Sequence, residues 1–373
     1  QKAAALLVVG DSGLAEIAVD ALHDALRDSR SYEVRNQVAL ALGSIASLGG
    51  AAACGDRAVV ALADALHGDV DRDVQRTVVH ALAMVVTCCS NNGNAALATL
   101  FAASSEHQDP EIQAEVPEAL GRQGVALVAM NDEGVEEVIA VLCKIARHNV
   151  NPLVRRGAVR SLGNVASACG SEACGKQVVS GLAEVLHSDG DEEVVRVAVS
   201  ALRVVLVSCG PEGRRHGLRP LLNVGLEHPC GKVREDVATI LEEFCPMMAP
   251  AVEGRLAILG RLVHWLRQAW AREGASELAN CIAALRKALR DDADAAVRSA
   301  FVKALGGIAV APVIRHYCAQ ATAALADAIR IETDEGAFRI TANMLSEVVL
   351  RCPAGRARAL KALAGGGLKH SNP

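Results

Sequence analysis

Five histidines stand at matching places along the chain, each beside a polar turn between two expected helices. Imidazole is a common metal ligand, so histidines in register raise the possibility of a metal site. Equivalent positions in adjacent helix layers lie roughly 10 Å apart, too far to share one ion at bond lengths of about 2 Å. We therefore expect solvated turn histidines, with no metal and no cofactor; they are His67, His107, His148, His187 and His228.

Arginines concentrate in the middle of the chain and could bind an anion. Arg156, Arg160 and Arg203 lie off the apolar stripe of their helices, so we expect them on an exposed inner surface. One interpretation is a solvated helix face with local ion pairs to glutamates. The other is a docking strip for an acidic or phosphorylated segment, because guanidinium groups bind carboxylate and phosphate with two parallel hydrogen bonds. Arg214 and Arg215 belong to the same candidate strip.

The twelve cysteines would suggest disulfides in a short secreted chain. Here they sit singly inside apolar helical patterns, as Cys143 and Cys281 do, and no Cys-x-x-Cys motif occurs. We expect buried reduced thiols and an intracellular, cytoplasmic protein, with the nucleus or an organellar matrix left open.

Other features of the sequence narrow the classes of function that we expect. The net charge of −5 gives no general attraction to nucleic acids, and no apolar run reaches the ~18 to 20 residues of a membrane span. Neither a phosphate-binding glycine loop nor a Ser/His/Asp signature is present. Residues Ala3 to Val9 have the pattern of a helix already under way, so we also expect repeats upstream.

The elements that must position these residues come from one pattern that recurs along the chain. A first helix ends, a polar turn follows, and a second helix begins with an apolar anchor residue and continues with an Ala-Leu-Gly or similar step. Successive anchors are separated by 40, 38, 42, 40 and 39 residues, and then by 64. A fixed period near 40 is typical of stacked helix pairs. The anchors are Val34, Val74, Ile112, Val154, Val194, Val233 and Val297.

This pattern, clearest from Asp28 through Val34-Arg35 to Gly43, resembles the HEAT-repeat family. The resemblance implies an all-α, right-handed α-α superhelix of about eight helix pairs, related to armadillo solenoids. We expect a HEAT-repeat array over residues 1–245 and an irregular helical insert over residues 246–277. Further HEAT-like repeats and a tail should fill residues 278–373.

The resemblance also implies a ladder of Asp and Arg side chains that links each repeat to the next. Such charges repeated in register have a structural role, because they fix how the repeats stack. The expected members are Asp28, Arg35, Asp69, Arg76, Arg155, Arg234, Asp291 and Arg298.

Both tryptophans lie in the stretch where the spacing of 64 breaks the period. Tryptophan is frequent at binding hot spots, but it also packs in ordinary cores. Trp265 and Trp270 are five residues apart and so face different sides of a helix, one buried and one exposed. They are kept as candidate partner-binding residues.

The function expected from these features is that of a non-catalytic scaffold, a protein-binding subunit of a larger assembly. An enzymatic alternative comes from HEAT-like deoxyhypusine hydroxylases and phycobilin lyases, but the hydroxylases depend on His-Glu dipeptides and none occurs here. A second alternative is a nucleic-acid-associated subunit that uses the arginine strip, which a steep dependence of affinity on salt would reveal.

Overall fold

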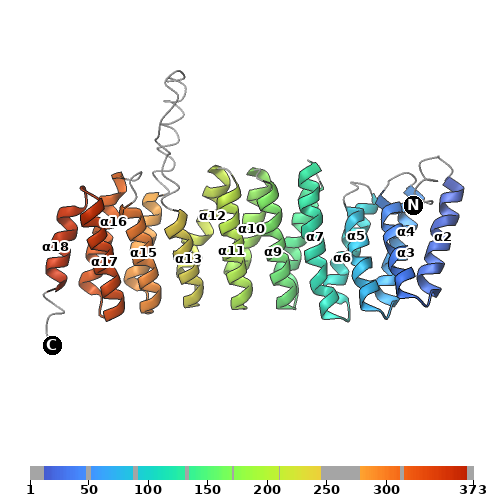
Figure 1. Cartoon of the computed structure of the whole chain (residues 1–373), viewed down its shortest axis with the longest axis horizontal. Coiled ribbons are helices and arrows are strands. Elements are labelled where there is room, and N and C mark those ends of the chain that lie inside the picture. The colour runs from blue at the N-terminus through green and yellow to red at the C-terminus, as the bar shows by residue number, and fades with distance from the viewer. Residues whose placement is uncertain are drawn as a thin grey trace, which may run out of the picture. The chain divides into compact units, whose positions relative to one another are not determined.

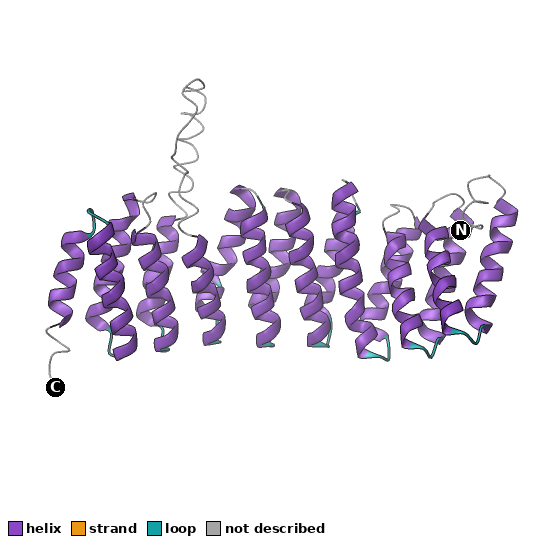
Figure 2. Cartoon of the chain, in the orientation of Figure 1, coloured by secondary structure: helices purple, strands orange, loops and turns teal. Residues whose placement is uncertain are grey.

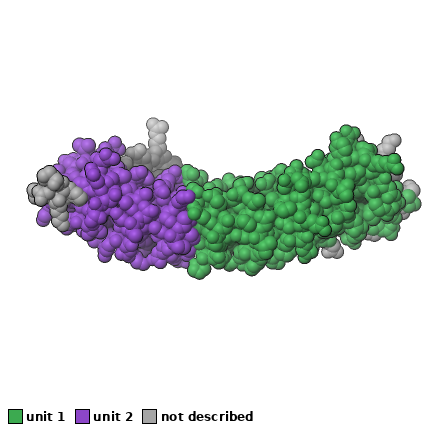
Figure 3. Space-filling view, turned by 90° about the horizontal axis from the view of Figure 1, so that it is seen from below, with its two compact units in different colours: residues 1–217 green, residues 218–373 purple. Residues whose placement is uncertain are grey.

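The computed structural model describes residues 12–47, 52–86, 91–130, 134–169, 172–209, 211–244, 278–310 and 315–367, with side chains at some helix ends left out. Within these ranges the regular structure is entirely helical (Figure 2). The chain divides into two compact units, residues 1–217 and residues 218–373, shown in two colours in Figure 3. The irregular insert expected over residues 246–277 lies outside the described residues.

The first unit is built from antiparallel helix pairs that follow one another in chain order (Figure 1). Second helices of successive pairs contact one another, and so do the first helices, which gives two rows. The first helices are α2 (Ser12–Asp28), α4 (Ala52–Gly68), α6 (Asn91–Glu106), α8 (Val135–His148) and α10 (Glu172–Ser188). The second helices are α3 (Tyr32–Ser47), α5 (Arg72–Val86), α7 (Pro110–Met130), α9 (Pro152–Cys169) and α11 (Glu192–Ser208). Helix α12 (Pro211–Asn223) runs across the boundary between the units.

The second unit continues the same alternation. A short 3-10 turn, η1 (Gly225–Glu227), precedes α13 (Gly231–Phe244), and a helix at residues 278–291 precedes α15 (Ala295–Val310). Helix α16 (Arg315–Ile331) pairs with α17 (Glu335–Arg351), and α18 (Arg356–Gly367) packs on both.

Several second helices begin at a capped turn. Asp191 accepts a hydrogen bond from the backbone N–H of Val194 at 3.0 Å, and Asp334 accepts one from Ala337 at 2.8 Å. A side-chain oxygen at this place satisfies an N–H group that has no partner inside the helix. The polar residues that interrupt the apolar pattern are therefore the start signals of the second helices.

The core is made of small aliphatic side chains from both rows. The anchors Val74, Ile112, Val154 and Val194 are completely buried. The glycine of the Ala-Leu-Gly step lets second helices approach closely, since a Cβ added at Gly43 would lie 2.9 Å from the Cβ of Ala81. This close approach explains why glycine recurs at that step and why the chain manages with 2% aromatic residues.

The stacking resumes beyond the break in the period. Helix α13 packs against α15. Residues 245–277, which lie outside the described ranges, come between these two helices in the sequence. Arg234 pairs with Asp292 at a sequence separation of 58, whereas the equivalent pairs elsewhere are 34 residues apart. The difference of 24 equals the excess of the anchor spacing of 64 over 40. The extra residues thus enter between two helices that still stack as neighbours.

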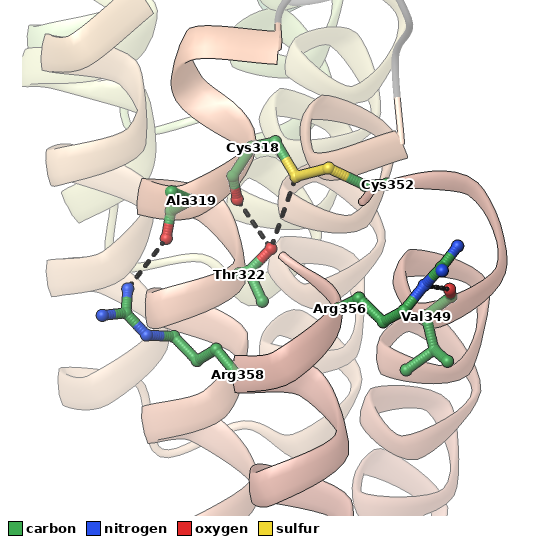
Figure 4. Close-up of a disulfide and its surroundings, with 7 residues drawn as sticks. All are labelled: Cys318, Ala319, Thr322, Val349, Cys352, Arg356 and Arg358. Atoms are coloured by element: carbon green, nitrogen blue, oxygen red, sulfur yellow. Dashed lines mark hydrogen bonds between the residues drawn. A yellow bond between two sulfur atoms is a disulfide. The ribbon is translucent and has the colours of Figure 1, made fainter. Parts of the chain in front are cut away.

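The expectation that the cysteines are reduced thiols is wrong for one pair. Cys318 of α16 and Cys352, directly after α17, form a disulfide (Figure 4). Periodicity gave no sign of it, because the two cysteines come from different helices, 34 residues apart. Cys143 is a buried free thiol, and burial raises its pKa to about 11, so it stays protonated and unreactive at neutral pH.

Candidate partner-binding surface

A ladder of charged side chains lies at the buried edge of several turns. Arg35, one residue after its anchor, donates to both carboxylate oxygens of Asp69 in the next repeat, at 2.6 and 3.1 Å. Its remaining nitrogen donates to the carbonyl of Ser29 in its own turn at 2.9 Å. The side chains of Arg35 and Asp69 are only 12% and 7% exposed. One guanidinium therefore ties its own turn to the next one.

The same arrangement recurs between the fourth and fifth helix pairs of the first unit. Arg155 donates to Asp189 at 2.7 and 2.9 Å and to the carbonyl of Asn149 at 2.9 Å. The hydrogen bonds that Arg155 donates to Asp189 raise the pKa of the Arg155 guanidinium. In the second unit Arg234 pairs with Asp292, and Arg298 pairs with Glu332 at 2.6 and 2.8 Å.

Uncharged side chains replace the ladder in the intervening repeats. Gln75 and Gln113 stand at the arginine position and donate to the carbonyls of Asp69 and His107, both at 2.7 Å. His107 stands at the position that a ladder acid occupies in other turns. One ring nitrogen of His107 accepts a hydrogen bond from the N–H of Asp109 at 3.0 Å, and the other lies 3.0 Å from the carbonyl oxygen of Leu66. His107 is buried, so the expectation of solvated turn histidines is wrong for this residue.

The structure places three of the expected ladder residues elsewhere. Asp28 pairs with its neighbour Arg27, Arg76 pairs with Glu111, and Asp291 is an exposed residue beside the ladder acid Asp292. The acids Asp189 and Glu332 were missed. A signal existed for the aspartates, because Asp69, Asp189 and Asp292 each lie five residues before an anchor.

Acid should weaken the ladder at Glu332. Burial raises the pKa of this carboxyl, but hydrogen bonds from Arg298 and from the backbone outweigh it, and the net pKa lies below the usual 4.5. A depressed pKa adds stability above pH 4.5 that is lost as the pH falls through the lowered value. We expect Glu332→Gln to flatten this acid dependence of unfolding, measured by denaturant titration between about pH 3 and 6. An unchanged slope in the variant would contradict the assignment.

A second set of charges lies outside the ladder, on the exposed side of the second helices of the first unit. We call this surface the second-helix face. It comprises Arg76 and His80 of α5, Glu111, Glu115, Glu118 and Arg122 of α7, Arg156 and Arg160 of α9, and Arg196 and Arg203 of α11.

The part of the second-helix face on α5 and α7 is internally compensated. Arg76 lies 3.5 Å from Glu111, and Arg122 lies 2.8 Å from Glu115. His80 contacts both Glu115 and Arg122, and its pKa is lowered, first by burial and then by the Arg122 charge. These groups already have partners, so this part offers little charge for an outside ligand.

The part on α9 is different. In the described ranges no carboxylate comes within ion-pair distance of Arg156, which is half-buried. Among the described residues, the only ion-pair partner of Arg160 is Glu118, at 3.6 Å, and both side chains are half exposed. An exposed pair at this distance contributes about 0 to 1 kcal/mol, so Arg160 can exchange Glu118 for another anion. Arg203 is exposed at the equivalent face of α11.

The other candidate binding residues contribute no described side chain. Arg214 and Arg215 lie on α12, but their side chains are outside the described set, and so are Trp265 and Trp270 entirely. The structure therefore brings together Arg156 and Arg160 and adds Arg203 on the neighbouring helix.

The described residues contain no group of three or more His, Cys, Asp or Glu side chains placed to hold a metal ion. Among the described helices, none combines the length and apolar character needed to cross a bilayer.

The repeat geometry agrees with known repeat proteins. Residues 59–163 and 98–203 each match the family model of HEAT repeats. Residues 59–203 are HEAT repeats. The resemblance stated from the sequence is thereby confirmed, and the fold is an all-α HEAT-like repeat fold.

One solved structure of similar fold is that of a karyopherin. The karyopherin Kap121p, in a structure bound to the SUMO protease Ulp1p, aligns with a TM-score of 0.54 and 16% identity over 95% of this chain. The present chain spans 36% of the length of that karyopherin. An engineered protein aligns over 94% of this chain and 82% of its own, with 22% identity and a TM-score of 0.41. No curated protein matches the sequence.

Proposed function

We propose that this HEAT-repeat protein is a non-catalytic scaffold that binds an acidic segment of a partner protein on the α9 and α11 part of the second-helix face. The observation that carries the proposal is the uncompensated guanidinium of Arg156 beside the weakly paired Arg160. Carboxylates of a partner could accept hydrogen bonds from both guanidinium groups. Only the weak ion pair between Arg160 and Glu118 would have to break.

The architecture supports a binding role over a catalytic one. A stack of helix pairs exposes a long surface and needs no enclosed pocket to bind an extended partner. The karyopherin of similar fold is itself bound to another protein in its structure. At 16% identity, this similarity shows a shared fold only. A partner segment lying along the row of second helices would make this chain a subunit of an assembly, in an intracellular compartment.

Charge reversal on α9 tests the proposal. We expect Arg156→Glu with Arg160→Glu to lower the affinity for the partner at least tenfold, because two attractive contacts become repulsive. The partner set would first be identified by affinity purification and mass spectrometry with the wild-type chain. Its acidic segment, as a labelled peptide, would then be titrated by fluorescence polarisation.

Two controls make this result specific. Arg330→Glu reverses one arginine charge at an exposed site on α16, in the other unit, and should leave the affinity unchanged. Helical circular dichroism should be the same for all variants. Undiminished binding by the double variant would refute the proposed surface. A nucleic-acid ligand with a steep salt dependence would refute the choice of a protein partner.

A further inference from the structure

A groove in the second unit combines an apolar floor with a basic rim. It has a volume of about 410 Å³ and lies between the helix at residues 278–291 and α16, with Arg358 of α18 at its edge. This size is within the usual range for small-ligand sites, about 300 to 1,000 Å³. The second-helix face of the first unit contributes nothing to it.

Alanines create the space. Ala279 and Ala283 are one helical turn apart on the first wall, and Ala319 and Ala323 occupy the same relation on α16. With methyl groups at these four positions the two helices leave a trough, and buried Ile282 adds to its apolar surface.

The rim of the groove carries four basic side chains, and only two of them form ion pairs with described residues. Arg286 pairs with Asp327, and Lys287 pairs with Glu227 at 2.6 Å. Across the described ranges, no carboxylate comes within ion-pair distance of Arg290 or Arg358. The described residues that line the groove include no Asp or Glu. Two positive charges are thus left for a ligand.

The edge arginine is held in place. Its guanidinium donates to the carbonyl of Ala319 at 3.2 Å, as Figure 4 shows. The disulfide lies one residue away at Cys318 and fixes the start of α18 through Cys352. A Cβ added at Gly355 would lie 2.5 Å from Thr322 Oγ1, so α18 starts in close contact with α16. Arg358 is therefore oriented before any ligand arrives.

We propose that this groove binds a phosphorylated side chain of a partner protein. A phosphate monoester carries about −1.5 to −2 charges at neutral pH, which matches the two uncompensated arginines. Its oxygens accept several hydrogen bonds at once, which suits guanidinium donors from two helices. The alanine floor takes the apolar part of the phosphorylated residue or of its neighbour. The site is separate from the acidic-segment site proposed on the first unit.

Phenyl phosphate is the probe, because it joins a phosphate monoester to an apolar ring. We expect it to bind the full chain, measured by isothermal titration calorimetry, and to bind Arg290→Glu at least tenfold more weakly. Arg290 makes no ion pair with the described residues, so this variant should fold normally. Arg358→Glu should show a similar loss. Arg330→Glu, on α16 but outside the groove, should bind as the wild type does.

Two other ligands sharpen the test. Phenylacetate should bind at least tenfold more weakly than phenyl phosphate, and methyl phosphate should also bind more weakly because it leaves the alanine floor uncovered. Equal binding of phenylacetate would overturn the choice of phosphate in favour of carboxylate. Equal binding by Arg290→Glu, or no binding to the wild type, would overturn the site. Arg156→Glu with Arg160→Glu should not change phenyl phosphate binding, so the two proposals fail independently.

Discussion

Removal of the acid from a ladder pair should destabilise the repeats on both sides of it. In Asp189→Ala, the Arg155 guanidinium keeps its buried position but loses both carboxylate hydrogen bonds. The Arg155 side chain is only 15% exposed, so water replaces the lost partner poorly. We expect a loss of about 3 kcal/mol in the free energy of unfolding of this region. Hydrogen exchange of α9 and α11, with urea unfolding followed by circular dichroism, measures it.

The same two repeats contain a matched control. Arg147 of α8 pairs with Glu184 of α10 on the outer side, where the side chains are 32% and 49% exposed. Glu184→Ala breaks an ion pair of the same kind, but we expect a loss below about 1 kcal/mol because solvent screens it. Replacement of Arg155 and Asp189 together by leucine should recover part of the loss, since no unpaired charge stays buried. Equal effects of Asp189→Ala and Glu184→Ala would contradict the assigned role of the ladder.

Reduction of the disulfide should loosen the C-terminal helices without affecting the first unit. The Cys318–Cys352 bond closes a segment with a sequence separation of 34 residues. On a chain-entropy model a closed loop of this length contributes about 4 kcal/mol to stability. We expect Cys318→Ser with Cys352→Ser to speed hydrogen exchange in α16, α17 and α18 and to lower their unfolding temperature. Repeat proteins respond locally, so α3 to α9 should exchange as before.

A free cysteine provides the control for this experiment. Cys230→Ser changes a half-buried thiol in the same unit and should leave exchange in α16 to α18 unchanged. Alkylation under native conditions followed by mass spectrometry should find Cys318 and Cys352 unmodified until a reductant is added. Exchange rates that are identical in the oxidised and reduced proteins would contradict a stabilising role for this bond.

Much of the architecture follows from the sequence because it depends on local, periodic interactions. The anchors at intervals near 40 residues, the polar turn residues and the Ala-Leu-Gly steps each act within one helix pair or between neighbours. The order and approximate positions of the described helices could therefore be predicted. The choice of Arg156 and Arg160 as exposed candidates also came from their place off the apolar stripe.

Only the tertiary structure shows which charged side chains form ion pairs within the described ranges and which do not. Arg155 and Arg156 are adjacent in the sequence, yet one is bound to Asp189 and the other has no carboxylate partner in the described ranges. One residue turns a side chain by about 100° around a helix, so small differences in register separate ladder from surface. The disulfide links α16 to the end of α17, and the alanine groove lies between the helix at residues 278–291 and α16. The repeat pattern does not distinguish these helices from their counterparts in other repeats. The positions of the disulfide and the groove depend on side-chain packing between layers, which no single helix encodes.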